Sequence, residues 1–237
     1  YLGLPIKQIP LLFGLNVNNA IDNINKTIFK PKLISSKNID KKTIDMQTLF
    51  IFIYKNLLAK NLENYKRFVE KVDSICIKIE KSYGNYISCK KGCAKCCMAI
   101  SLFPIEAVSI SLAIQSLSKK EIKNIRNRVK KSKDNYTCPL IEDNICLLYD
   151  NRPIICRTHG LPILINQDGE TKIDCCPLNF DGINNFPKDA IISLDNLNTI
   201  FVAINKVFVT EFSSIVNLPE RIHIREAIFM EIKLSKE

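Results

Sequence analysis

Four cysteines fall within nine residues of this chain, in the stretch Cys89-Lys-Lys-Gly-Cys93-Ala-Lys-Cys96-Cys97. Thiolates so close together repel one another unless cations lie between them, and a soft metal ion or an iron–sulfur cluster supplies such cations. A second group follows about forty residues later and comprises Cys138, Cys146, Cys156, Cys175 and Cys176. We predict that the two groups close on each other to build one metal centre, or two adjacent ones.

Disulfides are the main alternative for so many cysteines, and ten is an even number that permits a full set of pairs. Disulfide scaffolds are usually small domains that cannot bury enough apolar surface. This chain has 237 residues, 46% of them hydrophobic, and can form a substantial core. The vicinal pairs Cys96-Cys97 and Cys175-Cys176 also suit metal ligation better. We therefore favour a metal.

The sequence shows neither a signal peptide nor a membrane span. No basic segment is followed by an apolar run and a small-residue cleavage site. The most apolar windows, residues 49–59 and 200–212, contain lysines and fall short of the ~20 residues that a spanning helix needs. We expect a protein of the reducing cytoplasm.

A formal net charge of +10 raises the question of nucleic-acid binding. The charge reflects a general excess of lysine, and deprotonated thiols would offset much of it. The densest basic run, residues 119–133, fits the solvated face of a helix. Nucleic acid is therefore an unlikely partner. We expect a metal ion or cluster, and a protein substrate or redox partner beside it.

The first 130 residues divide into an extension and three helices. Prolines interrupt residues 1–45, which we interpret as a poorly defined N-terminal extension. A helical period then begins after Asp45, a suitable N-cap, and continues in one helix or two to about Gly84. Cys76 lies on its apolar stripe and is predicted to be a buried structural thiol. Pro104 begins a second helix, and the capping box Ser118-Lys-Lys-Glu121 begins a third.

The later part of the chain combines hairpins and helices. Asp143-Asn144, midway between Cys138 and Cys146, predicts a tight hairpin that brings those thiols together. Residues 163–166 and 171–173 predict a second hairpin leading to the vicinal cysteines. Two terminal helices are predicted, over residues 194–208 and 219–234.

The predicted fold class is therefore mainly α. Helices pack around an irregular cysteine-bound metal core, with one or two short β-hairpins. We expect residues 46–237 to form a single helical domain, in which the cysteine motif occupies about residues 85–180.

The local structure of the first cysteine group is left open. A helix would place Cys89, Cys93 and Cys97 at i, i+4 and i+8, whereas Gly92 also permits a loop that enters a helix at Cys93. On a helix, Cys96 and Cys97 would point about 100° apart. Neighbouring cysteines therefore do not readily chelate the same tetrahedral ion, which favours two metals.

Three other side chains near the second group are candidates for the site. Arg152 and Arg157 can donate hydrogen bonds and positive charge to a thiolate-rich centre. Pro153 keeps Arg152 out of the helical region, as in an irregular loop. His159 is a possible ligand, outer-layer group or acid–base residue. We assign no role to His223.

These cysteines stand in a longer motif. Cys-x3-Cys-x2-Cys-Cys is followed by Cys138-Pro, by Cys-x2-Tyr-x2-Arg-Pro-x2-Cys-Arg, and by a last cysteine before proline. The motif resembles the YkgJ-type cysteine-cluster family, described as a zinc- or iron-chelating domain and related to flagellin lysine N-methylase proteins. The resemblance covers about residues 85–180. It departs from the family in Leu140 and Ile141 and in the doubled cysteine at 175–176.

The resemblance implies metal binding and a set of ligands but leaves the metal open. The implied ligands are Cys89, Cys93, Cys96, Cys97, Cys138, Cys146, Cys156 and Cys176. Cys175 is an alternative to Cys176, because the doubling leaves the last ligand undecided.

Three functions compete. The first is a protein whose cysteines hold zinc or one or more iron–sulfur clusters, in a structural or redox role. The second is a cluster-dependent enzyme that modifies a protein or peptide, as the methylase relatives suggest. It would use S-adenosylmethionine, and Cys89-x3-Cys93-x2-Cys96 matches the radical signature, yet repeating strand–helix units are missing. The third is an adaptor that zinc merely folds. The sequence decides neither the metal nor any catalytic activity.

Overall fold

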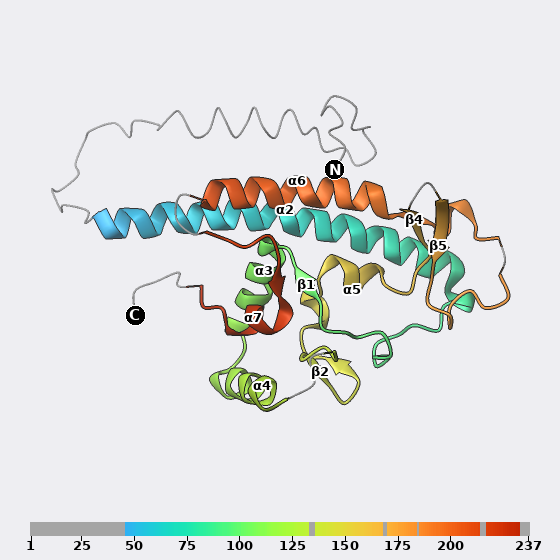
Figure 1. The fold of residues 1–237 in the computed structure, drawn as a ribbon, viewed down its shortest axis with the longest axis horizontal. Coiled ribbons are helices and arrows are strands. Elements are labelled where there is room, and N and C mark those ends of the chain that lie inside the picture. Colours follow the sequence, from blue (N-terminus) through green and yellow to red (C-terminus); the bar gives the residue numbers. More distant parts are fainter. Residues whose placement is uncertain (1–45, 133–135, 168–169, 184, 214–216, 233–237) are drawn as a thin grey trace, which may run out of the picture. The chain divides into compact units, whose positions relative to one another are not determined.

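The computed structural model describes residues 46–132, 136–167, 170–183, 185–213 and 217–232 of the chain. Figure 1 shows that helices make up most of its regular structure, which confirms the mainly helical class. The helices are α2 (Met46–Tyr83), α3 (Pro104–Gln115), α4 (Lys119–Lys131), α5 (Ile154–Thr158), α6 (Leu194–Phe212) and α7 (Ile224–Phe229). The predicted extension, and the cap predicted at Asp45, lie outside the described residues.

Short strands join into three small sheets. They comprise the antiparallel pair β1 (Ser101–Leu102) and β7 (Ile222–His223), the hairpin β2 (Ile141–Glu142) and β3 (Ile145–Cys146), and the three strands β4 (Ile163–Gln167), β5 (Glu170–Asp174) and β6 (Ile192–Ser193). Asp143 and Asn144 both have positive φ, as a two-residue hairpin turn requires. Both predicted hairpins are confirmed.

Helix α2 is a single helix of 38 residues. Its buried side chains recur at the helical period and form one stripe, which comprises Leu58, Tyr65, Phe68, Val72, Cys76 and Ile79. Cys76 is buried as predicted. The opposite face carries charged residues and is exposed to solvent. The helix is therefore held by its apolar stripe and not by its own propensity alone.

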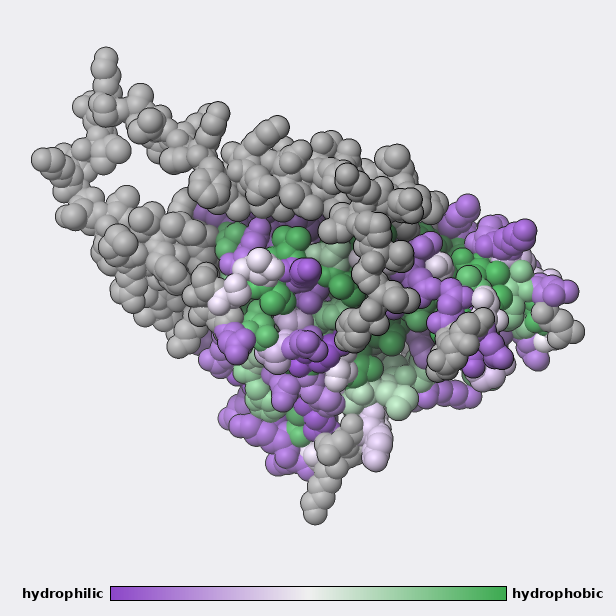
Figure 2. Space-filling view, turned by 45° about the horizontal axis from the view of Figure 1, so that its top comes forward, coloured by the Kyte–Doolittle hydropathy of each residue, from purple (hydrophilic) through white to green (hydrophobic). Residues whose placement is uncertain are grey.

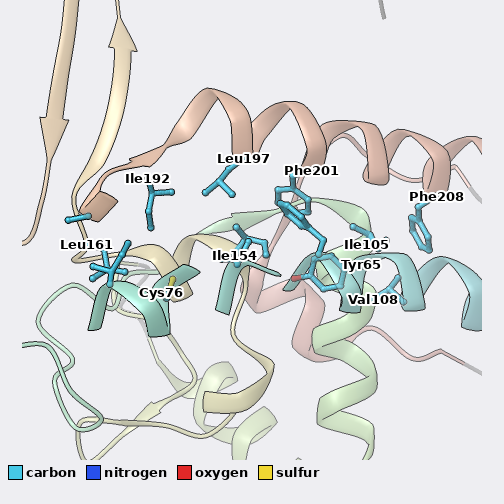
Figure 3. Packing of buried hydrophobic residues seen from close by; sticks show 14 of the residues in the cluster. Tyr65, Cys76, Ile105, Val108, Ile154, Leu161, Ile192, Leu197, Phe201 and Phe208 are labelled. Carbon is cyan, nitrogen blue, oxygen red and sulfur yellow. The ribbon is translucent and has the colours of Figure 1, made fainter. Parts of the chain in front are cut away.

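That stripe packs against α6 in the larger of two cores (Figure 3). Phe201 of α6 is its centre: its ring centroid lies 5.7 Å from that of Phe68, 6.0 Å from that of Tyr65 and 4.8 Å from that of Phe103. Each buried side chain of this size contributes roughly 1.5–3 kcal/mol to folding. Helices α2 and α6 thus form a frame that rests on apolar contacts.

Helix α3 connects this frame to the cysteine region, because it is apolar on all sides. Ile105 and Val108 belong to the larger core. Ile110 and Ile114 belong to the smaller core, together with Leu140 and other residues beside the cysteine hairpin. One helix therefore supports both regions.

The C-terminal segment differs from the prediction of a helix over residues 219–234. Residues 222–223 form strand β7, and Ser101 lies opposite His223 in its pairing with β1. Helix α7 is only six residues long and ends at Phe229, and its C-cap Met230 has φ −58° and ψ 141°, outside the helical region. Residues 222–223 pair with the backbone of β1 instead of forming a helix. Hydrophobic periodicity does not reveal such a long-range contact.

Within the described residues, no helix combines the length and the hydropathy needed to cross a membrane. On the face drawn in Figure 2, hydrophobic side chains are interspersed with hydrophilic ones.

Candidate metal centre

Seven of the ten cysteines line one cavity of about 260 Å³. They are Cys89, Cys93, Cys96, Cys97, Cys138, Cys146 and Cys156. The cavity lies among the loop that follows α2, the β2–β3 hairpin, α5 and the turn after α5. Its volume is at the lower end of the range for organic ligands, roughly 300–1,000 Å³, and suits a small inorganic centre.

The first cysteine group forms two successive turns and contains no helix. The amide of Cys93 donates to the carbonyl of Lys90 (2.9 Å), and that of Cys97 donates to the carbonyl of Ala94 (3.1 Å). Gly92 between them has φ +98°, a conformation that side chains disfavour. The helical alternatives for this segment are therefore wrong, because Gly92 breaks the helical path.

Backbone pairing joins the first group to the second. The amide of Cys138 donates to the carbonyl of Cys97 (3.1 Å), next to a β-bridge between Met98 and Thr137. In the adjoining hairpin the amide of Ile141 donates to the carbonyl of Cys138 (3.2 Å), and Ile141 lies opposite Cys146. Cys97, Cys138 and Cys146 are thereby brought together, as the predicted hairpin required.

Cys156 reaches the cavity from α5, a helix of five residues that was not predicted. Pro153 is its N-cap and keeps Arg152 extended, with ψ 142°. The Arg152 guanidinium stacks on the Tyr149 ring at 3.7 Å and donates to the carbonyl oxygens of Tyr149 (2.9 Å) and Cys156 (3.3 Å). Arg152 therefore closes the loop that carries Cys156.

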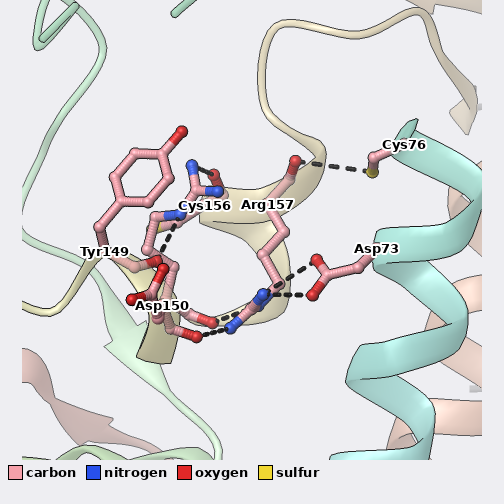
Figure 4. A network of polar contacts seen from close by, with 7 residues as sticks. Asp73, Cys76, Tyr149, Asp150, Cys156 and Arg157 are labelled. Atoms are coloured by element: carbon pink, nitrogen blue, oxygen red, sulfur yellow. Dashed lines mark hydrogen bonds and ion pairs between the residues drawn. The ribbon is translucent and has the colours of Figure 1, made fainter. Parts of the chain in front are cut away.

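Arg157 ties the same loop to helix α2 (Figure 4). Its guanidinium donates to both carboxylate oxygens of Asp73, at 2.9 and 2.6 Å, and to the carbonyl oxygens of Arg152 and Asp150. Its side chain is only 8% exposed. Nη1 makes both contacts to Asp73, and the other two nitrogens bind the carbonyl groups, so all three fix the orientation of the guanidinium. Cys76 adds a thiol hydrogen bond to the Arg157 carbonyl (3.6 Å).

Arg152 and Arg157 were both predicted to donate hydrogen bonds and positive charge to the thiolates. Their hydrogen bonds described above go to carbonyl groups and a carboxylate. The Arg152 charge nevertheless acts to lower the pKa of Cys146, although burial is stronger and leaves that pKa raised. Direct donation to bound thiolates stays a prediction.

Glu106 anchors α5 from behind. It is 4% exposed, and its carboxylate accepts from the amides of Ile154 (3.0 Å) and Phe103 (3.3 Å) and from the Tyr65 hydroxyl (3.4 Å). Burial raises the pKa of Glu106, which these donors partly offset. Because Ile154 is the first residue of α5, this carboxylate positions the helix that bears Cys156.

A second support surrounds Cys89. Asn179, buried at 4% exposure, accepts from the amides of Ser88 (2.8 Å) and Cys89 (3.1 Å) through Oδ1. Its Nδ2 donates to the Gly160 carbonyl (2.6 Å). Its side chain also hydrogen-bonds to the Cys89 thiol, which acts to lower the pKa of that thiol. The Asn179 side chain therefore connects its own segment to that of Cys89, 90 residues away, and to Gly160.

Gly160 packs directly against this pair of segments. A Cβ there would lie 3.0 Å from Cys89 Sγ and 3.6 Å from the Cβ of Cys176, and its φ is +97°. The side chains of Cys89 and Cys176 therefore both lie against Gly160. Cys176 thus lies beside the cavity thiols, although it does not line the cavity itself.

Cys175 turns the other way. Its thiol donates to the Gly160 carbonyl (3.2 Å), and the side chain packs against the larger core. His159 lines the cavity and is exposed to solvent. His223, predicted in a helix, lies in β7 and caps α7 through its side chain.

Burial is the main cause of the thiol pKa shifts. It raises the pKa of Cys156 to about 12 and those of Cys89 and Cys97 to about 11. Neighbouring thiolates raise each of them further. Such thiols are neutral at pH 7, and a cation between them is what would favour the thiolate forms.

The donor chemistry therefore fits zinc, iron or an iron–sulfur cluster, all of which take thiolate ligands. As placed, however, no three His, Cys, Asp or Glu side chains of the described segments meet in an arrangement that could hold a metal ion. All ten cysteines have free thiols. To share an ion, the cavity thiols would have to turn toward one another.

Residues 88–177 match the model of the CxxCxxCC family, "Putative zinc- or iron-chelating domain". This segment of the chain is similar to that family. The match covers less than half of the chain and includes every cysteine except Cys76. No curated protein and no solved structure matches the sequence. The relation to flagellin lysine N-methylases therefore stays a prediction.

Four supporting residues were not predicted: Asp73, Glu106, Gly160 and Asn179. Glu106 lies in the first turn of its helix and Gly160 stands three residues after Arg157, but neither position indicates its contacts. Asp73 reads as one more charge on the polar face of α2. Each acts on a residue more than ten positions away.

Proposed function

We propose that residues 46–237 form a single metal-binding domain that holds zinc or one or more iron–sulfur clusters through its two cysteine groups. The observation that carries this proposal is the gathering of seven thiols around one small cavity, with Cys176 beside them. The ligands in this proposal are Cys89, Cys93, Cys96, Cys97, Cys138, Cys146, Cys156 and Cys176. The family match to zinc- or iron-chelating domains supports the same chemistry.

Cys176 is preferred to Cys175 as the last ligand. The Cys176 side chain lies beside Cys89 at Gly160, whereas the Cys175 thiol donates to a backbone carbonyl and packs against the core. A ligand must be able to face the ion, and Cys175 would have to leave an apolar contact to do so.

The bound group would supply positive charge to thiols that burial otherwise keeps neutral. Zinc would add folding energy to a region built largely from turns. An iron–sulfur cluster would in addition carry electrons, and Cys96, exposed at the surface, would bring it near a partner. Ten free thiols agree with residence in a reducing compartment such as the cytoplasm.

Metal analysis and an absorption spectrum of protein purified without oxygen test the proposal. Iron with sulfide and broad visible absorption would identify clusters, and zinc in a colourless protein would identify a structural or Lewis-acid site. Protein that contains neither metal and takes up neither on reconstitution would contradict the proposal.

A further inference from the structure

We infer that the cysteines form two separate four-thiolate sites, and that the chain passes from one site to the other between Cys96 and Cys97. This inference rests on the proposed function and names the sites within it. The outer group comprises Cys89, Cys93, Cys96 and Cys176. The inner group comprises Cys97, Cys138, Cys146 and Cys156. Each group matches the four ligands of one zinc ion or one iron–sulfur cluster.

The outer group gathers around Cys89. Its sulfur and the Cβ of Cys176 both lie against Gly160, and Cys93 follows Cys89 in the same pair of turns. The Cys96 thiol is close enough to Cys93 and Cys176 for their charges to raise its pKa. The frame of this group is the contact of Asn179 and Gly160 with the Cys89 segment, where the room for a Cβ is taken up by the Cys89 sulfur.

The inner group gathers around the β2–β3 hairpin. Cys138 is joined by backbone hydrogen bonds to Cys97 and to Ile141, and Ile141 lies opposite Cys146 in the hairpin. The neighbouring charges that most raise the pKa of Cys156 include those of Cys138, Cys146 and Cys97. No thiol of the outer group is among them. Its frame is the set of contacts that Glu106, Arg152 and Arg157 make with α5.

The groups adjoin at the vicinal pair. The Cys96 and Cys97 thiols act on each other's pKa, and Cys93 also acts on that of Cys97. Their other thiol neighbours belong to different groups. Cys176 acts on the pKa of Cys96, whereas Cys138 and Cys146 act on that of Cys97. Adjacent side chains diverge from the backbone and seldom chelate one tetrahedral ion, so neighbouring positions serve different ions readily.

The two groups differ in their surroundings, and this difference sets the order in which they lose metal. Cys138 and Cys146 pack against the smaller core, whereas Cys96 is exposed to solvent. A chelator reaches an exposed site without opening the fold, but a site within packed segments exchanges through local unfolding. The outer site therefore releases its ion first.

Stepwise metal removal from the full chain tests the partition without any variant. The protein is loaded with zinc, titrated with a chelator and treated with an alkylating reagent, and each cysteine is located by peptide mass spectrometry. We expect two zinc ions per chain and alkylation in two groups of four, with Cys89, Cys93, Cys96 and Cys176 reacting first. Groups that mix the two sets, or all eight cysteines reacting together, would overturn the partition while leaving the proposed metal binding intact.

A matched pair of variants gives an independent reading. C96S and C97S change neighbouring residues, and native mass spectrometry counts the zinc ions that each retains. We expect one ion in each variant, with the outer thiols reactive in C96S and the inner thiols reactive in C97S; C175S, outside both groups, keeps two. The same thiols reacting in both variants would mean one shared centre. Uptake of neither zinc nor an iron–sulfur cluster by the unaltered protein would contradict the proposed function itself.

Discussion

The helical frame and the cysteine cavity are built by different means. Helices α2 and α6 meet through large apolar side chains such as Phe68 and Phe201, whose burial needs no ligand. The cavity is walled by turns, a two-residue-per-strand hairpin and a five-residue helix. Its thiols are mostly half-buried, and burial raises their pKa values instead of stabilising charge.

This contrast teaches that the two regions depend on different energies although they share α3. The frame is stabilised by apolar surface removed from water. The cavity lacks comparable regular structure, so we expect its stability to come from the bound metal and from a few polar contacts that hold α5 and Asn179. Experiments that perturb one region at a time can separate these two contributions to stability.

Removal of the metal has the largest expected effect, because a structural zinc ion contributes roughly 10 kcal/mol or more of binding free energy. We expect chelation to abolish amide hydrogen-exchange protection in residues 87–100 and 136–161, while residues 58–79 of α2 and most of α6 stay protected. Hydrogen exchange followed by mass spectrometry measures both. Equal loss of protection in α2 would show that the frame also depends on the metal.

Phe201→Ala is designed to destabilise only the frame formed by helices α2 and α6. Loss of a buried aromatic side chain is expected to lower the free energy of unfolding by about 3–5 kcal/mol, with the zinc content of the folded protein unchanged. Urea denaturation of the metal-loaded protein measures the first quantity. Val202→Ala is the control, because that neighbour is 47% exposed and its change is expected to stay within about 0.5 kcal/mol. A loss of zinc at full folding would contradict the separation of the two regions.

Asp73→Asn tests the link between the regions. It removes the charge that Arg157 contacts at 2.6 Å, in a pair that is partly buried. We expect a loss of about 1–3 kcal/mol, between the values for exposed and buried pairs, appearing as weaker metal binding next to Cys156. Competition with a coloured chelator measures it. Glu63→Gln, which disrupts an exposed pair with Arg67, is expected to change nothing measurable.

Gly160→Ala tests the close approach beside Cys89. The new Cβ would lie 3.0 Å from Cys89 Sγ, at φ +97°. Gly182→Ala provides the control, since it carries a similar backbone strain at φ +74° with nothing within 4 Å. Strain costs each variant roughly 1 kcal/mol of unfolding free energy. We expect Gly160→Ala alone to weaken zinc binding, and equal zinc affinity in both variants would contradict a role for this contact.

The smallest effect at neutral pH is the titration of Cys76, which appears only when the metal-free protein is taken to alkaline pH. Burial raises the pKa of Cys76 to about 12, from an ordinary value of 9.0. A raised pKa in the folded state contributes stability that is fully present below about 9.0 and is lost as the pH rises toward about 12. We expect Cys76→Ala to reduce this loss in urea titrations at rising pH. An unchanged slope would show that the Cys76 thiol does not titrate differently on folding.

Local patterns in the sequence were enough for much of the fold. The apolar period of α2, the proline and capping box that start α3 and α4, and the turn residues Asp143-Asn144 predicted elements that the structure contains. The match over residues 88–177 confirms the predicted resemblance to a zinc- or iron-chelating cysteine family. These features succeed because each depends on residues within a few positions of one another.

Tertiary structure decided what those patterns could not. The amide of Asn179 bonds to a segment 90 residues away, and Arg157 bonds to Asp73 across 84 residues. Strand β7 replaced the start of a predicted helix for the same reason, because β1 offered it a partner. By itself the sequence determined that this chain carries a thiol-rich domain on a helical frame. Which thiols are neighbours, and which buried polar groups hold them, depends on contacts between distant segments that no local pattern encodes.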